Sequence, residues 1–297
     1  MTAQGDGRGA RARRVSRRGA GLLALVVVSA WALLWVGVRA APSPPAGTAG
    51  TPWLASALED LARGRTESAI GKLRLARWNA PDDPEAPILL AWVHGSRGEW
   101  DQAAELGASL PLESMDPSSR LAAQGLLAMA YHATGRLPMA ARAYGALLEQ
   151  APAAVLALEG LGELALAAAR DEQQGARLSQ AWPASPAPAS SEAWRATAEA
   201  HLRDAIARAP DRVDLYVLLA SSLMESDRWD EAEELLRQAL RVDFRAARVH
   251  FSLGQVYEHR GDRQAAISAY RRALEADPSF TPALLRLERL EPSRSDG

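Results

Sequence analysis

Histidines are the side chains in this sequence best suited to metal binding or proton transfer, and they are dispersed along the chain. Two histidines four residues apart on one helix, as in an HExxH motif, would present both imidazoles to a metal ion. No such pair occurs, and no two histidines share a helical face with a carboxylate. We therefore interpret all five as core or surface residues and predict no metal site. They are His94, His132, His201, His250 and His259.

Other groups that could carry catalysis lack the neighbours that such chemistry needs. The chain has no cysteine, which excludes a thiolate metal site, a haem-attachment pair and a cysteine nucleophile. No GxSxG nucleophile elbow is present, and Gly160-Leu161-Gly162 lies inside a leucine-rich helical pattern rather than in a phosphate-binding loop. No pair of carboxylates is placed for acid/base work. The sequence therefore predicts neither an enzyme nor a bound cofactor.

The charge balance gives no electrostatic case for nucleic acid as a partner. The formal net charge is -2 and the isoelectric point is about 6.3. Nucleic-acid-binding domains usually carry a strong excess of basic residues on one face. We therefore expect no nucleic-acid partner.

The clearest pattern in the sequence is a pair of amphipathic helices over residues 247–280. Gly254 and Ala266 lie where the two helices come closest, because only small side chains permit that approach. The turn between the helices falls at Gly261-Asp262. One such hairpin cannot bury its own apolar face, so it needs neighbouring hairpins. The residues of the pattern are Leu253, Gly254, Tyr257, Ala266, Tyr270, Ala273 and Pro278.

This multi-position pattern resembles the tetratricopeptide repeat, and it recurs along the chain. The resemblance implies an all-α, right-handed superhelical solenoid of about six helical hairpins with a C-terminal capping helix. The uncharged run at 19–38 adds one predicted transmembrane helix before the solenoid. The strongest further match is at 121–154 and the weakest at 84–120. We expect repeats at 50–83, 84–120, 121–154, 155–212, 213–246 and 247–280, the capping helix at 281–291 and a disordered tail at 292–297.

The fourth repeat, 155–212, contains an insert at 171–192 between its two helices. Three prolines exclude a helix from the second half of the insert, and we expect it to project as a loop. The insert carries Trp182, which either packs onto the repeats or faces a partner. We predict that the insert contributes to binding. The three prolines are Pro183, Pro186 and Pro188.

The N-terminal region has the pattern of a membrane anchor. Residues 1–18 are rich in arginine, and 19–38 contain no charged side chain, enough for a helix of about 30 Å, the thickness of a bilayer core. The arginines indicate a cytoplasmic N-terminus. The chain would then cross the inner, cytoplasmic membrane once and place the repeats on its extracytoplasmic side. Residues 39–49 read as a Pro/Ala/Gly linker. The alternative is a signal sequence cleaved near Ala40, which would release the repeats for export.

The resemblance also implies a groove lined by the first helix of each repeat, which would bind a protein or peptide partner. For Ile88, Trp92 and Phe251, packing within a hairpin is an equal alternative. Family members that hold a C-terminal carboxylate use lysine, arginine and asparagine in this groove, whereas this chain has leucine, methionine or glutamate there. The implied groove residues are Ile88, Trp92, Met129, His132, Glu159, Glu163, Ser221, Met224, Phe251, Gln255, Glu258 and His259.

Together these patterns favour a membrane-anchored scaffold of a bacterial envelope, with an assembly, secretion or chaperone-like role. The alternative is a protein that holds apo-cytochrome c during haem attachment. An enzyme acting on glycans ranks below both, because no acid/base pair is placed. The identity of the partner and the oligomeric state stay open.

Overall fold

The computed structural model describes residues 51–291, and every element of regular structure in this range is helical. It contains fourteen α-helices, one short 3-10 helix and no strand. The predicted cytoplasmic segment 1–18, membrane span 19–38, linker 39–49 and tail 292–297 lie outside the described residues. No helix within 51–291 is both long enough and apolar enough to cross a bilayer. The described residues confirm the expected all-α fold built from stacked helical hairpins.

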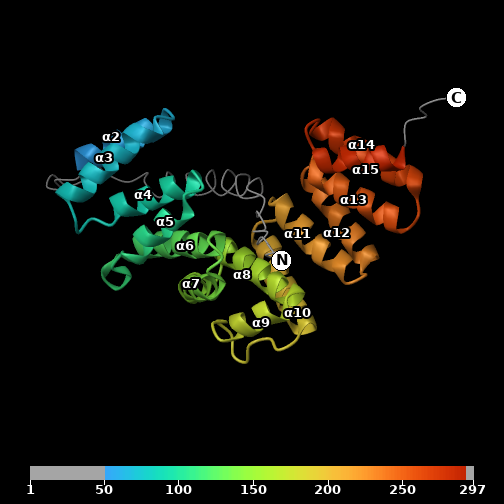
Figure 1. The fold of residues 1–297 in the computed structure, drawn as a ribbon, viewed down its shortest axis with the longest axis horizontal. Coiled ribbons are helices and arrows are strands. Elements are labelled where there is room, and N and C mark those ends of the chain that lie inside the picture. Colours follow the sequence, from blue (N-terminus) through green and yellow to red (C-terminus); the bar gives the residue numbers. More distant parts are fainter. Residues whose placement is uncertain (1–50, 292–297) are drawn as a thin grey trace, which may run out of the picture. The chain divides into compact units, whose positions relative to one another are not determined.

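The chain forms two compact units, one ending at Gly135 and the other beginning at Arg136. The boundary falls in the turn inside the repeat expected at 121–154. In the N-terminal unit each helix packs on the next, and α4 also packs on α6 (Figure 1). Its elements are α2 (Thr51–Ala62), α3 (Thr66–Asn79), α4 (Glu85–Ser96), α5 (Trp100–Ala108), η1 (Leu112–Ser114) and α6 (Pro117–Ala133).

The first hairpin is held together by a buried carboxylate. Asp60 stands where the repeat pattern has an aromatic residue, and its side chain is 1% exposed. It pairs with Lys72 Nζ at 2.6 Å and Arg65 Nη2 at 2.5 Å, and accepts a hydrogen bond from Ser68. Lys72, followed by Ser68, lowers the pKa of Asp60 to about 2. This cluster fixes the register of α2 against α3.

The second hairpin is shorter because its second helix, α5, ends before Pro111. The chain then returns through η1, which Arg120 holds by donating to the carbonyl oxygens of Leu112 at 2.8 Å and Met115 at 2.9 Å. Asp116 caps the next helix by accepting from two backbone N–H groups. As a result α6 begins at Pro117, four residues before the expected start of that repeat.

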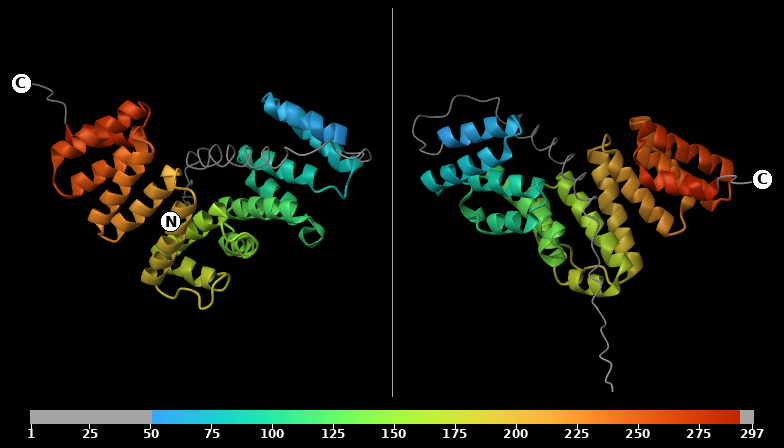
Figure 2. Two further views of the ribbon diagram at one scale, coloured as in Figure 1. Left: turned by 180° about the vertical axis from the view of Figure 1, so that it is seen from behind. Right: turned by 45° about the horizontal axis from the view of Figure 1, so that its top comes forward.

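The C-terminal unit is also built from stacked hairpins. Figure 2 shows α11 to α15 as successive packed helices, and α11 lies beside α13. A Cβ on Gly254 would come within 2.4 Å of the Tyr270 ring, so only glycine permits this packing of α13 on α14. The elements are α7 (Leu137–Gln150), α8 (Val155–Arg170), α9 (Glu172–Ser179), α10 (Ser191–Arg208), α11 (Val213–Glu225), α12 (Trp229–Val242), α13 (Ala247–His259), α14 (Arg263–Ala276) and α15 (Thr281–Leu290).

The insert in the fourth repeat differs from the projecting loop that the sequence led us to expect. Its first half forms the helix α9, which packs on α7, α8 and α10, while α8 packs directly on α10. Asp171 caps α9 by accepting from the backbone N–H groups of Gln173 at 2.9 Å and Gln174 at 3.2 Å. Leu178 is fully buried. The buried residues of α9 are only Gly175 and Leu178, so its sequence offers few apolar positions from which a helix could be predicted.

Arginines in the turns tie consecutive hairpins of the C-terminal unit together. Arg228, before α12, pairs through Nη1 with Glu199 of α10 at 2.7 Å. Arg260, after α13, pairs in the same way with Glu233 of α12 at 2.5 Å. Both carboxylates are buried. A buried carboxylate that lost its partner would destabilise the fold, so these pairs fix the stacking of the hairpins.

Candidate functional site

Three first helices of the C-terminal unit, α8, α11 and α13, are held side by side. Arg212, just before α11, donates through Nη2 to Glu159 near the start of α8 at 3.0 Å. At the other end, Arg170 of α8 pairs with Glu225 of α11 at 2.6 Å. Helices α8 and α11 therefore run parallel, and α11 packs beside α13. We call the part-exposed residues Glu163, Ser221, Met224 and Gln255 on these helices the first-helix face.

Glu159, a predicted groove residue, is buried rather than available to a partner. Its side chain is 4% exposed and both of its oxygens accept from Arg212. Burial raises the pKa of Glu159, and Arg212 opposes that rise. Arg212 also donates through Nε to Asp214 at 2.8 Å. Although burial works against it, Arg212 lowers the pKa of Asp214.

Glu163 lies one turn further along α8 and is only half-buried. Burial raises its pKa to about 7, and the charges of Glu159 and Asp214 add to the effect. Tyr144 of α7 lies against Gly160 of α8, where a Cβ would be 2.3 Å from the tyrosine ring. The first-helix face thus contains a carboxyl group that changes charge near neutral pH.

Two further predicted groove residues on α13 are used to attach the C-terminal helices. The centroid of the Phe251 ring lies 5.5 Å from that of the Tyr270 ring and 5.4 Å from that of the Phe280 ring. Glu258 accepts from the Tyr270 hydroxyl at 2.7 Å, and it pairs with Arg286 of α15 at 3.2 Å and with Arg289. The alternative of internal packing therefore holds for Phe251, and the Glu258 carboxylate fastens α15 to the stack.

The remaining predicted residues on α11 and α13 keep some exposed surface. Ser221, Met224 and Gln255 are part-exposed. His259 is exposed on one side and stacks on Trp229 on the other, with the ring centroids 3.9 Å apart and the rings 11° from parallel.

The predicted groove residues of the N-terminal unit are all half-buried. Ile88 packs against a cluster that includes Leu110 and Met115, and Trp92 packs against the core of the first two hairpins. Met129 and His132 lie on α6. Burial lowers the pKa of His132 to about 4, so its imidazole is neutral at physiological pH. The internal-packing alternative therefore accounts for much of the Ile88 and Trp92 surface.

Trp182 packs onto the C-terminal unit and does not face outward. The residue is 8% exposed, and its ring meets the Trp194 ring edge-on, with centroids 4.8 Å apart and an interplanar angle of 87°. Its neighbour Pro183 lies so close to α7 that a Cβ on Gly145 would be 2.5 Å from it. Of the two alternatives for this tryptophan, packing onto the repeats is the one observed, because Trp194 offers it an apolar partner.

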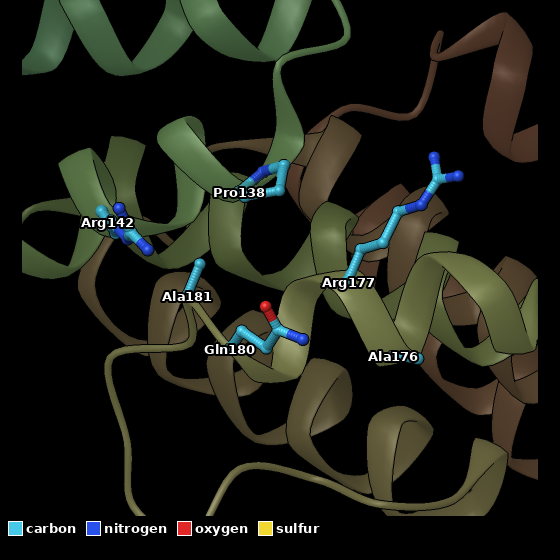
Figure 3. A pocket seen from close by; sticks show the side chains of 6 residues that line it. All are labelled: Pro138, Arg142, Ala176, Arg177, Gln180 and Ala181. Carbon is cyan, nitrogen blue, oxygen red and sulfur yellow. The ribbon is translucent and has the colours of Figure 1, made fainter.

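The docked insert creates a pocket between α7 and α9 that the sequence analysis missed. It has a volume of about 300 Å³, with Pro138 and Arg142 contributed by α7 (Figure 3). Neither Arg142 nor Arg177 makes an ion pair with any other described residue. The lining residues are Pro138, Arg142, Ala176, Arg177, Gln180 and Ala181.

An apolar patch is exposed at the open end of the first hairpin. The Lys72 ammonium donates to the Ser56 carbonyl oxygen at 3.4 Å, so Lys72 of α3 lies beside Ser56 of the antiparallel α2. Trp53 lies one turn beyond Ser56, and Leu75 and Trp78 lie one and two turns beyond Lys72, so all three are at the same end. They are 40%, 43% and 83% exposed, respectively.

Within residues 51–291, no group of three or more histidine, aspartate or glutamate side chains is arranged to hold a metal ion. The part-exposed groups described above suit contact with another molecule through apolar surface, hydrogen bonds and guanidinium groups.

Comparison with known proteins identifies the type of repeat. Residues 217–279 match the tetratricopeptide repeat family. No curated protein matches the sequence. Because the family match covers α12, α13, α14 and most of α11, it lies entirely within the C-terminal unit.

Solved structures share the fold at low sequence identity. A chain of the APC/C hetero-tetramer Cut9–Hcn1 has a TM-score of 0.58 and 16% identity, over 93% of this chain and 46% of that one. PilF of Pseudomonas aeruginosa has a TM-score of 0.58 and 16% identity, over 81% and 97%. The human IFIT1 dimer with m7Gppp-AAAA has a TM-score of 0.56 and 20% identity, over 75% and 51%.

The present chain thus spans about half of the Cut9–Hcn1 and IFIT1 chains that it matches. At these identities the likeness concerns the fold alone. The family match over 217–279 and the shared fold support a tetratricopeptide repeat protein.

Proposed function

We propose that this chain is a membrane-tethered adaptor that binds a protein or peptide partner through the first-helix face of its C-terminal unit. The observation that carries the proposal is the alignment of α8 and α11, which the Arg212–Glu159 and Arg170–Glu225 pairs hold in register, with α13 packed beside α11. A rigid face loses little conformational freedom when a partner binds, so more of the contact energy appears as affinity.

The chemistry of the first-helix face suits a peptide with both apolar and polar side chains. Met224 offers a flexible apolar surface, which adapts to partners of different shape. Ser221 and Gln255 can donate and accept hydrogen bonds, and Glu163 offers a carboxyl group. An extended or helical peptide lying across the three helices would contact all of these groups in turn.

The tether and the extracytoplasmic location belong to the same proposal. The uncharged segment 19–38 and the arginines before it support them, as in the sequence analysis. Twelve residues, 39–50, separate that segment from α2, and fully extended they reach about 40 Å. The exposed Trp53, Leu75 and Trp78 lie at the end of the hairpin where this linker enters, and tryptophan favours the membrane–water interface.

A protease-protection experiment on cells tests the location. With a tag at the C-terminus, we expect digestion once the outer barrier alone is opened. A tag that survives until the inner membrane is lysed would place the repeats in the cytoplasm and refute this part of the proposal.

A pair of apolar-to-acidic substitutions tests the binding face. Met224→Glu places a second carboxylate on the first-helix face, whereas Val242→Glu makes the same kind of change on an exposed site of the second helix α12. The full-length chain is purified from membranes, and the amount of partner that co-purifies with it is measured. We expect Met224→Glu to lower this amount by about tenfold or more, and Val242→Glu to leave it unchanged. Equal recovery with both variants would refute the face.

A further inference from the structure

We infer that the pocket between α7 and α9 binds an acidic peptide segment through the guanidinium groups of Arg142 and Arg177. This pocket lies on a second helix and the insert, so the inference goes beyond the proposed role of the first-helix face. The two sites would act on different parts of a partner, or on different partners.

The two arginines carry charge that no acidic neighbour in the described chain balances. On a helix, residues three or four positions away are the nearest neighbours, and this chain often places a carboxylate there. Arg203 pairs with Glu199 in this way at 2.9 Å, and Arg208 pairs with Asp204 at 2.9 Å.

Arg142 and Arg177 have no acidic residue at any of these positions. The neighbours of Arg142 are Pro138, Met139, Gly145 and Ala146, and those of Arg177 are Gln173, Gln174, Gln180 and Ala181. No described residue from another helix supplies a carboxylate to either of them. Two arginines therefore border one small hollow, and neither guanidinium group has a counter-charge from the described chain.

The shape of the hollow also suits a peptide segment. Figure 3 shows Arg142 and Arg177 on opposite sides of the pocket, with the extended side chain of Arg177 directed away from Arg142 and with Gln180, just after α9, between them. Pro138 and Ala181 supply apolar surface between them. A volume of about 300 Å³ accommodates one or two side chains of a peptide but not a folded element. Guanidinium groups bind carboxylates with two parallel hydrogen bonds, and the Gln180 amide can donate a third.

Helix α9 is fixed in place before any ligand arrives. Gly175 of α9 lies against Trp194, where a Cβ would be 2.9 Å from the indole nitrogen. Trp182, after α9, packs edge-on against the same tryptophan. Arg177 is therefore carried by a helix anchored on both sides of it, and binding does not have to order the backbone.

These features favour a peptide over a nucleic acid as the ligand. A nucleic-acid site needs a wide basic surface, whereas here two arginines border a pocket in a chain with a formal charge of -2. Phosphate groups share the chemistry of carboxylates toward arginine, so the test includes inorganic phosphate as a separate arm.

The test uses the full-length chain in detergent and a fluorescent hexapeptide of alternating glutamate and alanine. The matched control peptide has glutamine in place of each glutamate. We expect the glutamate peptide to bind with an affinity that falls as salt increases, and the glutamine peptide to bind at least tenfold more weakly. Equal binding of both peptides, or no binding of either, would overturn the inference. Binding of phosphate without binding of the glutamate peptide would overturn it as well.

Substitutions locate the binding in this pocket. We expect Arg142→Gln and Arg177→Gln each to weaken binding of the glutamate peptide about tenfold, and Arg142→Lys to weaken it less, because lysine keeps the charge but loses the paired hydrogen bonds. The control is Arg272→Gln, which removes an exposed arginine of α14 that makes no ion pair with a described residue.

Circular dichroism spectra and melting curves that match those of the parent chain show that each variant is folded. A folded Arg142→Gln/Arg177→Gln double variant with unchanged affinity would overturn the assignment. An equal loss of affinity in Arg272→Gln would do the same, since it would indicate a general effect of charge.

Discussion

Trp182 and Trp194 meet edge-on, with their ring centroids 4.8 Å apart, and this contact makes the insert part of the folded C-terminal unit. Trp194 lies on α10, and Trp182 lies in the segment that joins α9 to α10. The pair covers the side of α10 next to α9, while Pro183 rests on Gly145 of α7. The position of α9, and with it the arginine-lined pocket, therefore depends on this contact.

Removing the Trp182 ring should destabilise the protein. Trp182→Ala deletes a large buried side chain, and such deletions cost about 3–5 kcal/mol when the cavity does not collapse. We expect a loss of about 3 kcal/mol in the free energy of unfolding, measured by urea denaturation of the full chain with circular dichroism. The matched control is Trp78→Ala, at a site that is 83% exposed, and it should change stability by less than about 0.5 kcal/mol. Equal stability of the two variants would show that the insert is not docked.

Glu163 should make stability depend on pH near neutrality. Burial raises its folded-state pKa to about 7 from the ordinary 4.5, so the fold favours the neutral carboxyl. Ionisation of Glu163 therefore costs stability, and that cost is absent below pH 4.5, grows as pH rises and is complete above pH 7. The charged groups around it are Glu159, Asp214 and Arg212.

Glu163→Gln removes this titration. We expect the variant to match the parent chain near pH 4.5 and to exceed its stability at pH 8 by up to about 3 kcal/mol, because glutamine stays neutral. Urea denaturation at a series of pH values measures the difference. A constant difference between the two proteins across this range would mean that Glu163 does not titrate there.

Glu258 should govern how firmly α15 is attached. Its carboxylate is the shared partner of Arg286 and Arg289 on α15 and of the Tyr270 hydroxyl on α14. We expect Glu258→Ala to increase amide hydrogen exchange in α15 by about tenfold, corresponding to about 1.4 kcal/mol, with little change in α11. Glu275→Ala, which removes an exposed glutamate of α14 that has no ion pair with a described residue, is the control. Exchange in α15 that stays slow in Glu258→Ala would contradict the attachment.

The repeat pattern predicted the helical fold because it depends on contacts within one hairpin. Gly254 and Tyr270 lie 16 residues apart, and the small residue and the ring face each other wherever two helices join through a short turn. Asp60 departs from the pattern without breaking the hairpin, since Lys72 and Arg65 compensate its charge.

The candidate site was harder to predict, because side-chain partners from other helices decide which residues stay exposed. Periodicity places Glu159 and Glu258 on the first helices, but it does not reveal that Arg212 and Arg286 take up their carboxylates. Similarly, the prolines of the insert predict an irregular chain, yet the packing of Trp182 on Trp194 depends on the fold. The signal available for the pocket was the absence of acidic neighbours along the helix from Arg142 and Arg177.

Site-directed photo-crosslinking in intact cells tests the central claim, that a partner binds across the first-helix face, most directly. A benzoylphenylalanine replaces Gln255 on α13 in one version of the full-length chain, and Gln264, an exposed residue of the second helix α14, in the other. We predict a discrete crosslinked species from position 255 and no crosslinked species from position 264. We also predict that the crosslink from position 255 is lost when Met224→Glu is added. The same crosslinks from both positions, or a crosslink at 255 that persists with Met224→Glu, would contradict the account.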